Sequence, residues 1–312
     1  MLLTGENKVV GRYAPTPSGK LHIGNAFSFL ISYLDVAQQG GFMRLRIEDL
    51  DKVRCKPELI STMFKDLEWL DLPWEGDVIY QSKRYEAYSD AFLSLERQDL
   101  VYPCFCSRAD LHAASAPHTG EEIIYPGTCR RLSNSDRVAL LTKKTPSYRI
   151  KVPGKTFSFS DTYQDDCSFS LLDICGDFVV RRADKVFAYQ LAVVVDDAAM
   201  NITTVTRGCD LLSSAPRQMY LQQCLGLPSV KYAHIPLIVD ENGRRLSKRS
   251  GDISIEHFRS DTSMTSSEFW GKLAFDCGLV DELQPFSLKE LSRVANTSIL
   301  KRKKQIVISH IL

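Results

Sequence analysis

The chain has 312 residues, of which 44% are hydrophobic and 25% are charged. These proportions are typical of a globular protein with a buried core, and no apolar run approaches the roughly 20 residues of a membrane span. Residues 1–8 lack the apolar stretch of a secretory signal, so we expect a cytoplasmic protein without a membrane partner. A formal net charge of +1 excludes a uniformly basic nucleic-acid binder, and RNA binding would need cations gathered on one face.

The first expected strand covers residues 9–14, because β-branched and aromatic side chains dominate it. The prolines and the glycine of residues 14–19 end this strand and stiffen the following loop. Apolar residues then recur at helical spacing over residues 23–37, which predicts a helix. The unpaired N–H groups and the dipole at its start favour an anion. His22 lies there and could donate a hydrogen bond to a phosphate, or it could cap its own helix.

A second strand is expected at residues 42–47, directly before Glu48. Amphipathic helices are expected near residues 57–71 and 82–98. Arg12, in the first strand, is placed to approach a carboxylate, and Glu48 can pair with an ammonium group. These charges in a low-dielectric cleft suit an amino acid that carries an ammonium group and carboxylates.

Three of the nine cysteines have the spacing of metal ligands. Cys104 and Cys106 form a close pair, and Cys129 follows a Pro-Gly turn, which predicts a zinc site. From ligand chemistry alone, His112 or His118 would complete the set. The alternative is three unligated thiols in a core, because disulfides are disfavoured in a protein that is not exported. A zinc ion here would be structural and would tether a loop.

Residues 202–208 form an expected buried strand that ends in Arg207 and Gly, and ligands gather beyond such ends in α/β folds. The planar guanidinium of Arg207 suits a carboxylate and would discriminate against a neutral amide. A largely apolar helix is expected after Tyr189. Residues 234–239 form a further expected strand, followed by a turn and a basic loop with Lys248. Lys248 is a compact charge that suits a departing pyrophosphate, unless the loop is merely solvated.

Three segments carry a resemblance to a known family. Residues 12–24 are Arg-Tyr-Ala-Pro-Thr-Pro-Ser-Gly-Lys-Leu-His-Ile-Gly, residues 44–51 are Arg-Leu-Arg-Ile-Glu-Asp-Leu-Asp, and residues 245–249 are Arg-Leu-Ser-Lys-Arg. Together they resemble the glutamyl branch of the class I aminoacyl-tRNA synthetases. Asn25 replaces the final His of the family's general signature, and Arg245 replaces the first Lys of its Lys-Met-Ser-Lys-Ser loop.

The resemblance implies a set of site residues. It places glutamate against Arg12, Ala14, Thr16, Glu48, Tyr189 and Arg207. It places ATP, accompanied by Mg²⁺, against His22, Gly24, Asn25 and Lys248. His22 and Lys248 would be the catalytic residues that stabilise phosphoryl charge. Members of this branch without an anticodon-binding domain carry Cys-x-Cys followed by Tyr-x-x-x-Cys, which implies one zinc ion per chain on Cys104, Cys106, Tyr125 and Cys129.

The predicted fold is α/β: a Rossmann-like nucleotide-binding catalytic domain with a zinc-containing insertion and a short helical C-terminal region. The two halves of the catalytic domain are residues 1–100 and 176–250. The insertion is residues 101–175, with strands near residues 148–152 and 157–159. The C-terminal region is residues 251–312, with helices near residues 266–279 and 287–296. Its basic run, residues 301–304, is either a solvated tail or an RNA contact, and about the last thirty residues show no resemblance.

The chain stops about sixty residues after Lys248, short of the helical anticodon-binding domain of ordinary glutamyl-tRNA synthetases. The resemblance therefore implies activation of L-glutamate by ATP without tRNA, and transfer of glutamate to the queuosine base at the wobble position of tRNA(Asp). The alternatives are a truncated glutamyl-tRNA synthetase that charges tRNA(Glu), an adenylate-forming ligase with a small acceptor, and a non-catalytic RNA-binding module. We favour a monomer.

Overall fold

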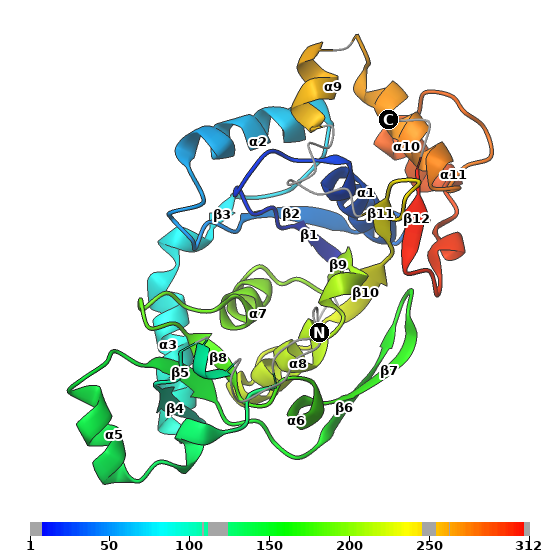
Figure 1. The fold of residues 1–312 in the computed structure, drawn as a ribbon. Coiled ribbons are helices and arrows are strands. Elements are labelled where there is room, and N and C mark those ends of the chain that lie inside the picture. Colours follow the sequence, from blue (N-terminus) through cyan, green and yellow to red (C-terminus); the bar gives the residue numbers. More distant parts are fainter. Residues whose placement is uncertain (1–7, 108, 112–123, 245–253, 262, 309–312) are drawn as a thin grey trace, which may run out of the picture.

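The structure is a computed structural model that describes residues 8–107, 109–111, 124–244, 254–261 and 263–308 (Figure 1). Helices and strands alternate along most of the chain, as predicted. Parallel strands form the centre of the molecule, and an antiparallel sheet lies at one end of it.

The first half of the central sheet contains three parallel strands. β1 (Val10–Tyr13) pairs with β2 (Phe42–Ile47), and β2 pairs with β3 (Ile79–Tyr80). The accompanying helices are α1 (Ile23–Ala37), α2 (Pro57–Trp69) and α3 (Tyr85–Arg97). The bounds of α1 and β2 agree with the predicted ranges, because in both segments the repeat of apolar residues matches the face that is buried.

The second half adds two more parallel strands, β9 (Thr204–Gly208) and β10 (Lys231–Ile235). α7 (Tyr189–Ala199) precedes β9, and α8 (Ser214–Leu225) connects the two strands. The backbone N–H of Thr203 donates a hydrogen bond to the carbonyl oxygen of Val10 at 2.9 Å, which places β9 beside β1. The carboxyl ends of β1 and β9 therefore meet at one edge, where sheets of this kind bind ligands.

The strand predicted at residues 234–239 is divided in two. β10 ends at Ile235, and β11 (Leu237–Val239) begins after Pro236. Proline has no N–H to donate to a neighbouring strand, so the ladder stops there and the chain changes sheets. β11 then pairs in parallel with β12 (Gln305–Val307).

The insertion is built on antiparallel pairing. β4 (Val101–Cys104), β5 (Ser147–Ile150) and β8 (Phe178–Arg181) form one sheet, and β6 (Thr156–Asp161) and β7 (Asp165–Ser170) form a hairpin. Two short helices, α5 (Asn134–Leu141) and α6 (Leu171–Ile174), belong to the same region. The strands near residues 148–152 and 157–159 are therefore confirmed as β5 and β6.

The C-terminal region contains the predicted helices and one strand. α9 (Ile255–Asp261), α10 (Ser266–Asp276) and α11 (Leu288–Val294) are helical, and Thr265 and Ser287 start the last two with capping boxes. The sequence did not predict the strand, β12, which follows the basic residues 301–304. β12 completes the small sheet that begins at β11, which gives its backbone groups partners.

Two large hydrophobic clusters lie on the two sides of the parallel strands. One joins α1 and α2 to α10 and α11, and the other joins α3, α7 and α8 to β5 and β8. In the first cluster Trp270 is 1% exposed and donates its indole N–H to the carbonyl oxygen of Leu70 at 2.9 Å. No helix among the described residues combines the length and the apolar character that a membrane crossing requires.

Candidate functional site

A cavity of about 540 Å³ lies at the carboxyl ends of β1 and β9. It is lined by every described residue that the sequence assigns to glutamate or ATP: Arg12, Ala14, Thr16, His22, Gly24, Asn25, Glu48, Tyr189 and Arg207. Lys248 lies outside the described residues. Residues from both halves of the sequence thus meet in one pocket, which the parallel sheet explains, since its strand ends lie at one edge.

The start of α1 forms one wall of this pocket. His22 is the N-cap of α1, and its backbone N–H donates to Oδ1 of Asn25 at 3.1 Å. Asn25 lies three positions after the N-cap, and its side chain therefore helps to cap the helix. Past the segment that contains Lys248, Ser254 pairs with His22 as an isolated β-bridge, and the N–H of Ile255 donates to the carbonyl oxygen of Leu21 at 2.9 Å. The chain thus returns from that segment directly to the start of α1.

Arg12 brings one buried cation to the pocket from β1. Its Nη1 donates to the carbonyl oxygen of Thr206 at 3.0 Å, and its Nε lies 3.7 Å from Oδ1 of Asp197. Burial lowers the pKa of Arg12, and the carboxylate of Asp197 opposes this shift. Arg12 is only 6% exposed. An anion in the pocket would therefore meet a positive charge that water screens poorly.

Arg207 brings a second buried cation from the end of β9. Its Nε donates to Nε2 of His234 at 3.0 Å, and its Nη1 donates to Oε1 of Gln218 at 2.8 Å. Its Nη2 is buried and has no hydrogen-bond partner among the described residues. A buried donor without an acceptor is costly, so this nitrogen is suited to a ligand anion. The sequence did not point to His234 or Gln218, since neither belongs to a recognisable motif.

Glu48 provides the negative charge of the pocket. Its Oε1 accepts a hydrogen bond from Nη2 of Arg46 at 3.1 Å, and the hydroxyl of Thr16 lies 3.4 Å from its Oε2. The backbone N–H of Glu48 donates to the carbonyl oxygen of Pro15 at 3.0 Å, which fixes the rigid loop against the end of β2. Burial raises the pKa of Glu48, whereas Arg46 lowers it. The carboxylate is therefore held by a cation from behind while it lines the cavity.

Arg46 is a supporting residue that was not assigned a role from the sequence. It is fully buried, and its Nη1 donates to Oδ1 of Asp197 at 2.6 Å. Burial alone lowers the pKa of Arg46, but the carboxylates of Asp197, Glu48 and Asp196 outweigh burial and raise it. Its place in the Arg-Ile-Glu-Asp segment beside Glu48 was the available signal.

Tyr189 is the first residue of α7 and closes the pocket on the side of the second half of the sheet. Burial raises the pKa of its hydroxyl, and the charge of Arg207 acts in the opposite direction. The raised pKa keeps the phenol protonated near neutral pH, so it can donate as well as accept a hydrogen bond.

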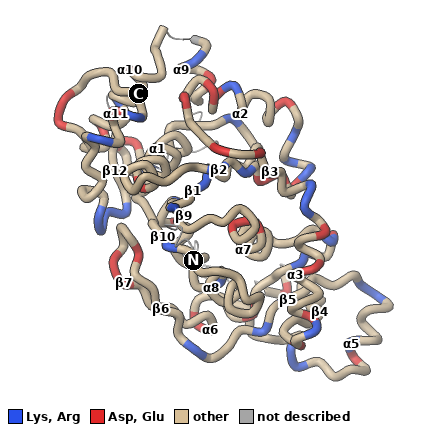
Figure 2. The backbone as a smooth tube through the Cα atoms, turned by 180° about the vertical axis from the view of Figure 1, so that it is seen from behind, with Lys and Arg blue, Asp and Glu red and all other residues tan. Residues whose placement is uncertain are grey.

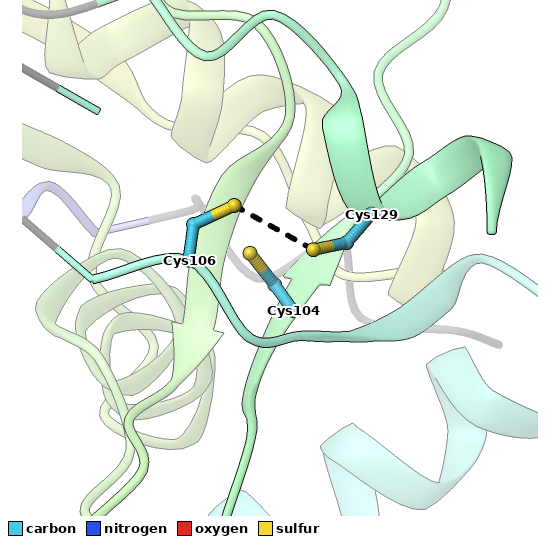
Figure 3. Close-up of side chains that lie close together, drawn as sticks. All are labelled: Cys104, Cys106 and Cys129. Atoms are coloured by element: carbon cyan, nitrogen blue, oxygen red, sulfur yellow. Dashed lines mark hydrogen bonds between the residues drawn. The ribbon is translucent and has the colours of Figure 1, made fainter. Parts of the chain in front are cut away.

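The three cysteines with metal-ligand spacing lie together in the insertion (Figure 3). Cys104 ends β4, Cys106 follows two residues later, and Cys129 lies in a short 3₁₀ helix, Thr128–Arg131. Their sulfur atoms all lie within 4.8 Å of one another, and the hydroxyl of Tyr125 lies 3.4 Å from Sγ of Cys104. His112 and His118, the other candidates for the fourth ligand, lie outside the described residues.

The sulfur geometry suits a metal rather than a disulfide. Sγ of Cys106 and Sγ of Cys129 are 3.6 Å apart, whereas a disulfide needs about 2.0 Å. Sulfurs that are about 2.3 Å from a tetrahedral zinc ion lie roughly 3.8 Å from each other. The three thiols could therefore hold a metal ion, with the hydroxyl of Tyr125 close to one of them.

Arg149 supports this cluster and was also missed from the sequence. Its Nε donates to Sγ of Cys104 at 3.3 Å, and its guanidinium carbon lies 3.8 Å from the centre of the Tyr125 ring. Burial raises the pKa of Cys104, but hydrogen bonds from Tyr125 and from the backbone of Cys106, together with Arg149, outweigh burial and lower it. The lowered pKa makes the thiolate, which is the form that binds metal, easier to form at Cys104.

A second cavity, of about 640 Å³, connects the pocket with the cysteine cluster. It shares Thr16, Glu48 and Tyr189 with the first cavity, and it reaches Cys104 and Cys106. Two of its cations, Lys144 and Arg149, come from the insertion, and Arg182 comes from the turn after β8. The two cavities therefore have one common wall.

The basic residues 301–304 precede β12, and Figure 2 shows basic and acidic segments interspersed along the described chain. Arg302 forms an ion pair with Asp165, and Nζ of Lys304 donates to Oε1 of Gln164 at 2.7 Å. Part of this basic run thus contacts the turn between β6 and β7, although all four side chains are exposed.

A family model described as tRNA synthetases class I (E and Q), catalytic domain matches residues 8–310. It extends over the C-terminal residues in which the sequence alone showed no resemblance. A glutamyl-Q tRNA(Asp) synthetase from Symbiobacterium thermophilum is 45% identical over 306 residues, which cover 94% of each chain. A protein of the same name from Geobacter sulfurreducens is 44% identical over 81% of this chain and 79% of its own length. Another from Nitratidesulfovibrio vulgaris is 38% identical over 97% of this chain and 96% of its own length.

Two solved structures have a similar fold. The crystal structure of a glutamate-tRNA synthetase from Elizabethkingia anophelis matches with a TM-score of 0.82 and 23% identity, over 97% of this chain and 68% of that one. A glutamate tRNA ligase from Elizabethkingia meningosepticum, in complex with its amino acid, matches with a TM-score of 0.81 and 24% identity. The match covers 97% of this chain and 67% of that chain. At these identities the likeness concerns the fold alone.

Proposed function

Because this chain belongs to the family of class I tRNA synthetase catalytic domains for glutamate and glutamine, we propose that it activates L-glutamate with ATP and transfers it to the queuosine of tRNA(Asp). The observation that carries this proposal is the pocket that combines Arg12, Arg207 and Glu48. Its support is the name of the relatives that are 38–45% identical, glutamyl-Q tRNA(Asp) synthetase.

Glutamate has one ammonium group and two carboxylates, and the pocket has matching charges. In this proposal Arg12 and Arg207 bind carboxylates, because both cations are buried and Nη2 of Arg207 has no hydrogen-bond partner among the described residues. Glu48 binds the ammonium group, and Tyr189, Ala14 and Thr16 fix the orientation of the substrate. Glutamine would leave one cation without its anion, which is the basis for selectivity.

The first chemical step is attack by a glutamate carboxylate oxygen on the α-phosphorus of ATP, which forms the acyl–phosphate bond of glutamyl-adenylate and releases pyrophosphate. His22, Gly24 and Asn25 line the pocket at the start of α1, whose dipole favours an anion. We assign the phosphates to this end, with Mg²⁺ accompanying ATP, and Lys248 to the departing pyrophosphate. Their contribution is positioning and electrostatic stabilisation of the transition state.

The second step is attack by a hydroxyl of the acceptor on the activated carbonyl, which forms an ester and releases AMP. The acceptor must approach past the wall that both cavities share, formed by Thr16, Glu48 and Tyr189. We therefore assign the queuosine nucleoside to the second cavity. Two cations of that cavity, Lys144 and Arg182, suit the phosphates of the anticodon loop.

The cysteine cluster is assigned to one structural zinc ion, with Cys104, Cys106, Tyr125 and Cys129 as ligands. When bound, the ion would hold the end of β4 to the segment that contains Cys129. It would thereby shape the second cavity, to which Cys104 and Cys106 also belong.

The decisive experiment for the first step is ATP–pyrophosphate exchange without tRNA. Exchange should occur with L-glutamate and should be much slower with L-glutamine or L-aspartate. Exchange that is equally fast with glutamine would contradict the assignment of the pocket, and no exchange with any amino acid would contradict catalysis.

The second step is tested with labelled glutamate and two preparations of tRNA(Asp), from cells with and without queuosine. Label should enter only the tRNA that contains queuosine. The same assay with tRNA(Glu), and with small amines, tests the alternatives. Label in tRNA(Glu) but not in tRNA(Asp) would favour a truncated glutamyl-tRNA synthetase, and label in a small amine would favour an amino-acid ligase.

A further inference from the structure

Arg207 and His234 are direct neighbours on two parallel strands. β9 and β10 pair in a register that sets Arg207 opposite His234, and Nε of Arg207 donates to Nε2 of His234 at 3.0 Å. Nη1 of Arg207 is held by Gln218 at 2.8 Å. Neither His234 nor Gln218 lines the cavity, so two of the three guanidinium nitrogens are fixed from behind the pocket.

A second link fixes His234 itself. Its Nδ1 lies 2.6 Å from Oδ2 of Asp161, and both side chains are 0% exposed. Oδ1 of Asp161 accepts the backbone N–H groups of Tyr163, Gln164 and His234, each at 3.0 Å. Burial opposes the ionisation of Asp161, but the hydrogen bonds from His234 and from the backbone outweigh burial and lower its pKa. An anchored carboxylate thus lies at the end of the chain of contacts.

These contacts allow one protonation state of His234. Its Nε2 must be an acceptor because Nε of Arg207 can only donate, and its Nδ1 must therefore carry the proton that Asp161 accepts. Burial lowers the pKa of His234, and the charge of Arg207 acts in the same direction, while Asp161 and the carbonyl of Leu211 oppose them. A neutral imidazole with a proton on Nδ1 satisfies both neighbours.

We propose that His234, with its tautomer set by Asp161, is a positioning residue that orients Arg207 for the carboxylate of the substrate. The series of hydrogen bonds from Asp161 through His234 ends at Nε of Arg207. It leaves the buried Nη2 of Arg207 for the ligand. This inference rests on the proposed function of the pocket. It adds two residues, 27 and 46 positions from Arg207 in the sequence, to the determinants of amino-acid recognition.

The role predicts that an acceptor opposite Nε matters more than an imidazole ring. Glutamine carries its side-chain oxygen at the same position along the side chain as Nε2 of histidine, so His234→Gln keeps an acceptor for Nε of Arg207. His234→Phe keeps an aromatic ring of similar size but removes both nitrogens. Asp161→Asn keeps the side-chain shape and can retain the three bonds to Oδ1, but its amide N–H₂ would face Nδ1 of His234. The ring proton would then move to Nε2, where it opposes the N–H of Arg207.

The test is the dissociation constant of L-glutamate, and separately of ATP, measured by calorimetry on the wild type and the three variants. His234→Phe and Asp161→Asn should weaken glutamate binding about tenfold or more, because a charged hydrogen bond is lost. ATP binding should change less than about twofold, because the α1 end of the pocket is untouched. His234→Gln should remain within about threefold of the wild type for glutamate.

Equal weakening in His234→Gln and His234→Phe would show that only packing matters and would overturn the inference. Should His234→Phe fail to fold, Asp161→Asn decides alone, and unchanged glutamate binding in that variant would also overturn it. A wild-type protein that does not bind glutamate would contradict the proposed function as well, whereas unchanged variants of a glutamate-binding wild type contradict this inference only.

Discussion

Arg46 and Asp197 form a buried ion pair beneath the candidate site, with 2.6 Å between Nη1 and Oδ1. The side chain of Arg46 is 0% exposed and that of Asp197 is 5% exposed. Asp197 also lies 3.7 Å from Nε of Arg12, and Nη2 of Arg46 donates to Glu48. One buried pair thus supports both a cation and an anion of the pocket.

Replacing Arg46 with methionine should destabilise the fold as well as the site. The variant removes the cation but leaves the carboxylates of Asp197, Asp196 and Glu48 around its former position. Loss of one partner from a buried ion pair typically costs about 3–5 kcal/mol, because the remaining charge is buried without compensation. Urea unfolding should therefore show a lower free energy of unfolding for Arg46→Met than for the wild type.

The matched control is Arg54→Met, because the side chain of Arg54 is 77% exposed and its Nε is 3.6 Å from Asp51. An exposed pair contributes at most about 1 kcal/mol, so this variant should remain close to the wild type. If Arg46→Met is no less stable than Arg54→Met, the buried pair is not a major support of the fold.

The sequence predicts those helices and strands in which apolar residues recur with a single period and lie on a single buried face. α1 is such a case, since Ile23, Phe27, Leu30 and Leu34 all lie on its buried side. β12 was missed because only pairing with β11, about seventy residues earlier, makes the short segment a strand. The break at Pro236 was visible as a residue, but the change of sheet that it allows depends on the partner strand.

Contiguous motifs in the sequence predict part of the candidate site, whereas residues that reach it through distant contacts were not assigned a role. His22, Glu48 and the cysteine pair belong to short recognisable segments. Arg46 was not assigned a role, because its partner Asp197 is 151 residues away. The role that we propose for His234 depends on the strand register that places it opposite Arg207. Arg46 at least lies in a recognisable segment, whereas His234 and Gln218 carry no local signal of this kind.

The purified protein should contain one zinc ion per chain, and Cys129→Ser should lose it, because a hydroxyl replaces one thiolate ligand. Elemental analysis of dialysed protein measures both. Cys224→Ser is the matched control, since Cys224 lies on α8, outside the cluster, and it should keep its zinc. Retention of a full equivalent by Cys129→Ser, or absence of zinc from the wild type, would exclude this site.

The fourth ligand is decided by Tyr125→Phe, which removes only the phenolic oxygen. If Tyr125 binds the metal, this variant should release zinc to a chelator faster than the wild type, while His112→Ala and His118→Ala should not. Faster release from one of the histidine variants, together with an unchanged Tyr125→Phe, would assign the fourth position to that histidine.

Lys248→Ala should slow ATP–pyrophosphate exchange by about 100-fold or more, because one well-placed donor to transition-state charge is lost. The melting temperature should stay unchanged, which separates a loss of catalysis from a loss of folding. Lys301→Ala provides the control, because Lys301 is exposed and belongs to the C-terminal basic run. An exchange rate within about threefold of the wild type would reject the role of Lys248 in pyrophosphate departure.

Asp35 links α1 to β9 and to the turn between β6 and β7. Oδ2 of Asp35 accepts a hydrogen bond from the hydroxyl of Thr206 at 2.7 Å, and Oδ1 accepts one from Tyr163. Burial raises the pKa of Asp35 to about 6, although both hydroxyl groups act to lower it. The folded protein therefore holds a proton at Asp35 more tightly than the unfolded chain does.

Asp35→Asn should alter the pH dependence of stability in a defined direction. The raised pKa means that the contribution of Asp35 is fully present below about pH 4 and is lost as the pH rises through about 6. The wild type should therefore lose about 2 kcal/mol relative to Asp35→Asn between about pH 4 and pH 7. Urea unfolding of both proteins across this range measures the difference, in which the other titrating groups cancel. A difference that stays constant with pH would mean that the pKa of Asp35 is not raised.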